Sequence, residues 1–402
     1  MLIIFRLAMK YFHQQFDPLY VIDEAKRYKF IGKRKTRKMK TKYAKCLPGT
    51  TTKEMFSEFI WDLLPVLTFE QLTILLASMG CQPLVKELQE VHRPGRIFCA
   101  KRYSTHLVAF HKNLKSLLDD NGFVDKVRAL ENLAMVARLK LARTVNLEAR
   151  QNDANELSIV MWLRAQQFRD ETQDQRMSIL NEMMAGLPND IDNSLAHVIA
   201  LTQTAVNFAL LGRVEASLAV VQEVKQLVDS CDEQFAVSVA CHDIQYVFRI
   251  LYDKTKDKAY LDKVLEECDL GIQSLEQVIP DDRMLLERLF KLNMTQSLLS
   301  ITHQLDINDE LPCSTVNRLF AQSLTQQVRN QHFQGIEKRR EFIYMLSVAR
   351  LNELENNLEL ALEYATRAVA ILEDGLYFAN DLDRAESFLR RVYQKALPIE
   401  VV

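Results

Sequence analysis

Two cysteines and two histidines raise the question of a metal site, because Cys81, Cys99, His106 and His111 fall within 31 residues. Structural zinc sites usually draw their ligands in pairs about two to five residues apart, since one short loop must wrap the ion. Cys81 and Cys99 are 18 residues apart. The spacing therefore favours core cysteines and histidines on a helix face over a zinc site.

Other polar groupings also have structural explanations. Cys241 and His242 are adjacent, and neighbouring side chains on a helix point about 100° apart, so they do not form a nucleophile and its base. The segment 306–310 has the carboxylates of a calcium loop, but Leu311 stands where that loop needs glycine. The acidic pairs 190/192 and 381/383 stand at the starts of expected helices, where carboxylates cap free backbone N–H groups.

Glycine-dependent catalytic motifs are missing from the sequence. GxGxxG, GxxxxGK[ST] and GxSxG are absent, as is the zinc-protease motif HExxH. The 402 residues include only 10 glycines, and none of them cluster into a loop that could cradle a phosphate. We therefore expect no enzyme activity, no cofactor and no metal. A helical enzyme of unfamiliar type is the remaining alternative, and a buried cluster of perturbed carboxylates in a deep pocket would favour it.

One segment is strongly basic. Residues 26–45 contain 11 lysines and arginines and no acidic residue, and without them the net charge of the chain would change from −2 to −13. The core of this basic arm is Lys33, Arg34, Lys35, Arg37, Lys38, Lys40 and Lys42. An acidic body disfavours a broad nucleic-acid surface, so only the arm could contact phosphates.

Three interpretations of the basic arm remain open: a solvated disordered segment, a nuclear-import signal, and direct contact with nucleic acid or anionic lipid. Tyr28, Phe30 and Tyr43 lie among the charges, and such rings could stack on bases. Met39 and Met55 could be the true start sites, in which case part or all of the arm would not belong to the protein.

The expected compartment follows from the cysteines and the N-terminus. Seven scattered cysteines without a CxxC motif indicate free thiols in a reducing environment. The apolar start is interrupted by Arg6 and Lys10 and has no small-residue cleavage site, so we expect no signal peptide. No window reaches the ~18 apolar residues of a membrane span. We predict a cytoplasmic protein that could also enter the nucleus.

Any functional site in this chain must be positioned by helices, because the sequence pattern is helical. Apolar residues recur every three or four positions over 125–149, 258–278 and 358–374, which predicts one apolar stripe along each helix. Glycine and proline interrupt this pattern at short intervals. We predict helices over 125–149 and 153–186, then hairpins over about 190–229, 231–278, 281–332 and 335–374, closed by a helix over 381–396.

These hairpins resemble the tetratricopeptide repeat over about residues 190–375. In 201–218, Ala205 and Ser217 occupy small crossing positions, Phe208 the aromatic position and Gly212 the turn. Ala361 and Ala368 fit the second helix of another copy, and Val264, Cys268 and Gly271 those of a weaker one. The hairpin starts are 41, 50 and 54 residues apart, longer than the family's usual period of about 34.

The resemblance implies a fold and a mode of binding. The fold is all-α, a right-handed α-solenoid of stacked helical hairpins with an N-terminal helical region. A peptide or helix of a partner protein would bind in a concave groove lined by the first helices. By position, the groove residues would be Gln203, Val206, Arg249, Asp253, Arg350 and Glu353. The Lys/Asn clamp for a C-terminal carboxylate is absent at the matching positions, which disfavours chaperone tails as ligands.

We therefore divide the chain into residues 1–52, a partly disordered segment with the basic arm; 53–121, a small helical region; and 122–402, the repeat array. Residues 53–121 would cap the solenoid, or form an interaction domain of death-fold type. The expected function is a protein–protein scaffold or adaptor whose partner the sequence does not identify. The alternative is a nuclear or nucleic-acid-associated adaptor that uses residues 26–45.

Overall fold

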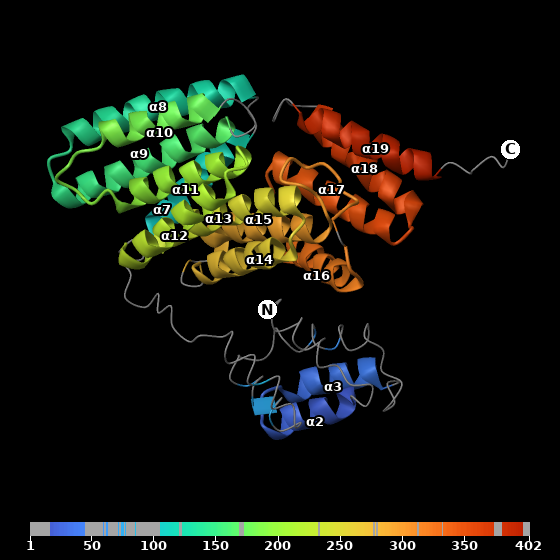
Figure 1. Cartoon of the computed structure of the whole chain (residues 1–402). Helices are drawn as coiled ribbons and strands as arrows, with labels where there is room; N and C mark the ends of the chain where they lie inside the picture. Colours follow the sequence, from blue (N-terminus) through green and yellow to red (C-terminus); the bar gives the residue numbers. More distant parts are fainter. Residues whose placement is uncertain are drawn as a thin grey trace. The chain divides into compact units, whose positions relative to one another are not determined.

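The structure is a computed structural model of the chain, shown in Figure 1. It describes residues 17–44, 105–119, 123–168, 173–231, 234–275, 278, 280–311, 313–331, 333–373 and 380–396, together with the isolated residues 59, 62, 71, 74, 75, 77 and 85. These residues are all-helical, with 15 helices and no strand. The chain divides into two compact units, Met1–Ile97 and Phe98–Val402.

The first unit contains a short helical hairpin. Helix α2 (Pro18–Arg27) begins at Asp17, whose side chain accepts a hydrogen bond from the Leu19 N–H at 2.9 Å. Helix α3 (Lys33–Tyr43) packs against α2. Proline suits the first turn of α2 because its missing N–H would have no partner in the helix there. The basic arm is therefore helical over 33–43.

The second unit is built from helices that pack in neighbouring pairs. The predicted hairpins are present, and the predicted closing helix is α19 (Asp381–Ala396). Figure 1 shows the pairs following one another in chain order along the unit. Their bounds are α11 (Ser194–Leu210) with α12 (Val214–Ser230), α13 (Gln234–Thr255) with α14 (Lys258–Gln273), α15 (Pro280–Leu298) with α16 (Thr315–Gln331), and α17 (Lys338–Leu354) with α18 (Leu358–Glu373). The all-helical, paired architecture is confirmed, and the right-handed α-solenoid stays a prediction.

The front of the array differs from the predicted pair of long helices. It contains α8 (Phe123–Arg143), α9 (Leu147–Gln167) and α10 (Gln173–Gly186), so the prediction of one helix over 153–186 was wrong. Asn146 starts α9 by accepting a hydrogen bond from the Ala149 N–H at 2.9 Å. After α9, residues 169–172 are all polar, and the apolar period that would extend the helix is lost.

Small residues allow the helices to approach closely. Gly212 has a φ of 74° at the turn between α11 and α12, a conformation that glycine adopts without strain. The Ser217 hydroxyl of α12 donates to the Ala205 carbonyl of α11 at 2.8 Å. A methyl group at Gly271 of α14 would lie 2.7 Å from both Cε atoms of Phe290 in α15. The positions that resemble the repeat motif are thus close contacts between helices.

Helices α9, α11, α13, α15 and α17 form what we call the first-helix layer. Within it, α9 packs against α11, α11 against α13, and α15 against α17. A hydrogen bond of 3.4 Å from Arg249 to the Asn293 side chain links α13 to α15. The layer also receives α7 (Thr105–Asp119), which packs against α9 and α15. Of the predicted region 53–121, the structure describes α7 and seven isolated residues.

No helix in the described parts of the chain is both long and apolar enough to cross a membrane.

Candidate binding site

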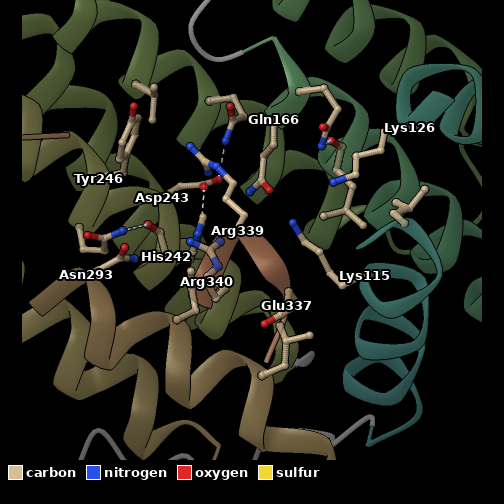
Figure 2. Close-up of a pocket in the computed structure, with 18 of the residues that line it drawn as sticks. Lys115, Lys126, Gln166, His242, Asp243, Tyr246, Asn293, Glu337, Arg339 and Arg340 are labelled. Atoms are coloured by element: carbon tan, nitrogen blue, oxygen red, sulfur yellow. Dashed lines mark hydrogen bonds and ion pairs between the residues drawn. The ribbon is translucent and has the colours of Figure 1, made fainter. Parts of the chain in front are cut away.

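A pocket of about 110 Å³ lies where α7, α8 and α10 meet the first-helix layer. Figure 2 shows Lys115 and Lys126 on one side of it, and His242, Asp243 and Tyr246 of α13 on the opposite side. Glu337, Arg339 and Arg340 contribute to it from the start of α17. The cations that line the pocket are Lys115, Lys126, Arg176, Arg249, Arg339 and Arg340. Its three carboxylates are Asp119, Asp243 and Glu337.

Asp243 holds three helices of the layer together. Its Oδ2 accepts hydrogen bonds from Trp162 Nε1 of α9 at 3.1 Å, and from Thr202 Oγ1 and Gln203 Nε2 of α11 at 2.8 and 2.7 Å. Its Oδ1 is 2.9 Å from the His242 Nδ1. Buried carboxylates need such donors, because leaving a charge without partners inside a protein is costly. Asp243 therefore fixes the floor of the pocket.

Two arginines of the pocket bind neutral oxygen atoms. Arg249 donates to Asn293 Oδ1 at 3.4 Å and to the carbonyls of Ile301 and Thr302 at 3.4 and 2.9 Å. Arg176 of α10 donates to Asn207 Oδ1 of α11 at 3.0 Å. Such acceptors orient a guanidinium group through its planar set of N–H donors. These bonds thus position two positive charges beside the pocket.

Helix α7 is held on the layer by contacts along its length. The His111 ring stacks on Trp162 with centroids 5.5 Å apart, and burial lowers the pKa of His111 well below its usual value. Lys112 forms an ion pair of 3.1 Å with Asp282 of α15. At its end, Asp119 Oδ2 accepts from the Lys338 N–H of α17 at 3.1 Å. A helix from before the array thereby reaches its last hairpin.

Lys115 of α7 faces the pocket between these contacts. Burial lowers the pKa of its amine to about 7, and nearby Arg340 lowers this pKa further, whereas Glu337 opposes the shift. Burial also lowers the pKa of His242, although the bond to Asp243 favours its charged form. The pKa of Lys115 therefore lies close to neutral pH, and burial favours the neutral form of His242.

The predicted groove residues lie in three separate places. Gln203, Val206 and Arg249 all line the pocket. Asp253 lies elsewhere, at the end of α13, where its Oδ2 accepts from the His303 N–H at 2.7 Å and is 2.5 Å from the His303 Nδ1. Asp253 thus anchors the connection between α15 and α16.

Arg350 and Glu353 belong to an ion-pair network at the far end of the array. Arg350 contacts Glu353 at 2.5 Å and Asp309 at 2.9 Å, and Glu353 also pairs with Arg391 and Lys395 of α19 at 2.7 and 2.6 Å. Burial opposes ionisation of Glu353, but hydrogen bonds from Lys395, Arg350 and Arg391 outweigh it and hold its pKa below the usual value. Arg350 and Glu353, which were both predicted to line the groove, therefore join α17 to α19.

The core of the basic arm, residues 33–42, lies on α3 in the first unit. Its exposed residues recur at helical spacing and are Lys33, Arg34, Arg37, Lys38 and Lys42. Lys35 and Lys40 are half-buried, and Lys40 and Lys42 form ion pairs of 2.5 and 2.8 Å with Asp23 and Asp62. Tyr43 is buried, with its ring edge against Phe59 and its hydroxyl bonded to Asp62. The interpretation of Tyr43 as a ring that stacks on bases is therefore wrong.

The structure describes only part of the suggested metal ligands. Cys81 and Cys99 lie outside the described residues, His106 is exposed, and His111 is buried on α7. Within the described residues, no three His, Cys, Asp or Glu side chains gather as a metal site would require.

Sequence reasoning missed Lys115, Lys126 and Arg340 as pocket residues. Lys115 and Arg340 are 225 positions apart, and they meet only because α7 crosses to the start of α17. The apolar stripe of α7 predicts a buried helix, but it carries no information about which helices cover it.

In comparisons with known proteins, no family model, no curated protein and no solved structure matches this chain.

Proposed function

We propose that this protein is a scaffold or adaptor, without catalysis, that binds a peptide or helix of a partner protein on the first-helix layer. The proposal keeps the tetratricopeptide-like mode of recognition and a cytoplasmic or nuclear setting. The observation that supports it best is α7, a helix from outside the predicted repeat array that already lies on this layer.

The contacts of α7 illustrate how the layer can hold a helix. They combine ring stacking on Trp162, an ion pair with Asp282 and a backbone contact at Lys338. Protein interfaces commonly combine such buried aromatic anchors with charged pairs at the rim. The pocket beside α7 leaves room for a further group to bind the same layer.

A capture experiment on the full chain tests the proposal. Proteins captured from nuclease-treated lysate by the wild type are compared with those captured by Lys115→Glu, which reverses a charge at the pocket. The matched control is Lys258→Glu, which changes an exposed lysine on α14. We expect specific partners to be lost with Lys115→Glu alone. Equal capture by all three proteins would contradict binding at this site.

A second candidate function rests on the exposed face of α3. Lys33, Arg34, Arg37 and Lys38 lie on that face, while Thr36 and Met39 are buried on the other. Four cations at helical spacing fit a row of phosphates, which would suit a nuclear or nucleic-acid-associated adaptor.

Salt dependence distinguishes this candidate from the first. If the four cations each contact a phosphate of duplex DNA, the logarithm of the affinity should fall with the logarithm of the salt concentration, with a slope of about −3.6. Anisotropy of a labelled duplex measures that slope. Replacing the four cations by glutamine should abolish binding, and a duplex that binds the quadruple variant equally well would rule out α3.

A further inference from the structure

We propose that the pocket on the first-helix layer is a binding site for a phosphate monoester, carried either by a small molecule or by a phosphorylated side chain. This goes beyond the scaffold function, because the pocket could take such a group whether or not a partner protein covers the layer.

The charge of the pocket is the first argument. Six cations and three carboxylates line it, an excess of three positive charges when Lys115 is protonated. The chain outside residues 26–45 carries a net charge of −13. A concentration of positive charge in an acidic protein attracts anions to that point, because low-dielectric walls focus the field. A dianion is the ligand that best balances this excess.

The arrangement of the cations is the second argument. Lys115 and Lys126 approach from α7 and α8, while Arg339 and Arg340 belong to the first turn of α17 (Figure 2). Arg339 is already paired with Asp381 at 2.8 Å, so the planar fork for two oxygens of a phosphate would come from Arg340, and the lysines add compact charges. Among the described residues, the Lys115 ammonium makes no hydrogen bond or ion pair. It can therefore turn to an incoming oxygen without first losing a partner.

Size and lining favour an ester group over a larger ligand. A volume of about 110 Å³ holds roughly seven to eleven water-sized groups, enough for a phosphate and a few carbon atoms. Apolar side chains also line the pocket, namely Leu118, Leu163, Val206, Leu285 and Leu289. They would contact the carbon atoms next to the ester oxygen, which inorganic phosphate lacks.

Binding should be coupled to a proton. A dianion beside Lys115 favours its charged form, so the complex takes up a proton if Lys115, whose pKa is about 7, is partly neutral beforehand. Several other charged groups surround Lys115: Arg339, Arg340 and Glu337 from α17 and its start, Lys126 from α8, Asp119 and His111 from α7, His242 and Asp243 from α13. Burial lowers the pKa of both histidines and so favours their neutral forms.

The pH dependence has a definite sign. Only protonated Lys115 attracts the anion fully, so affinity should fall as the pH rises through 7. Sulfate is a useful probe because it remains a dianion over the whole range, whereas phosphate itself titrates. If binding requires the protonated amine, the sulfate affinity should drop about 25-fold between pH 6.5 and pH 8.5.

Calorimetry on the full-length protein tests the site with three probes: sulfate, glycerol phosphate and a short phosphoserine peptide. We expect binding of all three, with proton uptake seen as a dependence of the enthalpy on buffer. Tighter binding of the peptide would identify a protein source for the phosphate, and tighter binding of glycerol phosphate a small-molecule source. No binding at millimolar concentrations, or binding without proton uptake, would overturn the proposal.

Two variants locate the site. Lys115→Met and Arg340→Met keep the aliphatic parts of the side chains and remove the charges, and each should weaken binding at least tenfold. Lys258→Met on α14 is the matched control and should bind as the wild type does. Unchanged binding by both pocket variants would overturn the assignment. If a variant fails to fold in circular dichroism, the pH dependence of sulfate binding to the wild type still decides.

Discussion

Replacing Gly271 by alanine tests how closely two successive hairpins pack. Gly271 lies in α14, and an added methyl group would stand 2.7 Å from two ring carbons of Phe290 in α15, where ordinary contact begins near 3.4 Å. The Phe290 side chain is fully buried and its ring is rigid, so it has little space into which to move. The Phe290 Cζ would lie closer still, so relief requires a shift of about 1 Å between the two helices.

The expected magnitude combines two opposing effects. Overpacking in a buried core costs typically about 1–3 kcal/mol, and a clash with a rigid ring belongs at the upper end. Alanine in place of glycine stabilises a helix interior by about 1 kcal/mol. We therefore expect Gly271→Ala to lower the free energy of unfolding by about 2 kcal/mol.

Urea denaturation followed by circular dichroism measures this change, with Gly186→Ala as the control. Gly186 ends α10, and a methyl group there would meet only the Arg138 Nε, at an ordinary 3.6 Å. The control should be neutral or stabilised by up to about 1 kcal/mol. Adding Phe290→Leu to Gly271→Ala should restore part of the lost stability, so that the two changes are not additive. If Gly271→Ala behaves like Gly186→Ala, α14 and α15 are not in close contact.

Two further predictions concern buried and ionised groups. Asp243→Ala leaves three donors without their acceptor and should lower the free energy of unfolding by about 3–5 kcal/mol in urea denaturation, whereas the exposed Asp190→Ala should change it by less than about 0.5 kcal/mol. A hydrogen bond from Arg391, assisted by Arg350 and opposed by burial, lowers the pKa of Asp309 from 3.8 to about 2. Ionised Asp309 therefore stabilises the folded protein fully above about pH 4, and this stabilisation is lost as the pH falls towards 2. The full pKa shift corresponds to about 2.4 kcal/mol, or about 1 kcal/mol after allowing for the exposure of Asp309. Thermal melts at pH 4.5 and 2.5 should show this loss of stability in the wild type and a smaller loss in Arg391→Met. Equal losses in the two proteins would contradict the prediction.

Local sequence patterns predicted the helical hairpins because each depends on residues close in the chain. The recurrence of apolar residues every three or four positions, together with the turn at Gly212, was sufficient to predict the helices α11 to α18. The same reasoning failed at 153–186, where apolar residues on both sides suggested one helix across a polar break of a few residues. A break this short is visible only when the packing of α9 against α10 is known.

The candidate site was less predictable because its residues come from distant segments. Gln203, Val206 and Arg249 lie on α11 and α13 and line the pocket, whereas their role in a partner groove stays a prediction. Lys115 and Arg340 face the same pocket only through the path of α7, which no local period reveals. Asp253 occupies a comparable repeat position, yet it anchors His303, because the long connection after α15 folds back onto α13.

The path of α7 also has a consequence for synthesis of the protein. Asp119 binds the backbone of Lys338, which is 219 residues later in the chain. At about 5–20 residues per second, the ribosome needs roughly 10–45 seconds to make that partner after Asp119 has been added. During this time the apolar side of α7, with Leu107, Leu114 and Leu118, has no finished layer to cover it. The nascent chain therefore exposes the apolar side of α7 until its last hairpins are complete. We expect the nascent chain to depend most on chaperones during this interval.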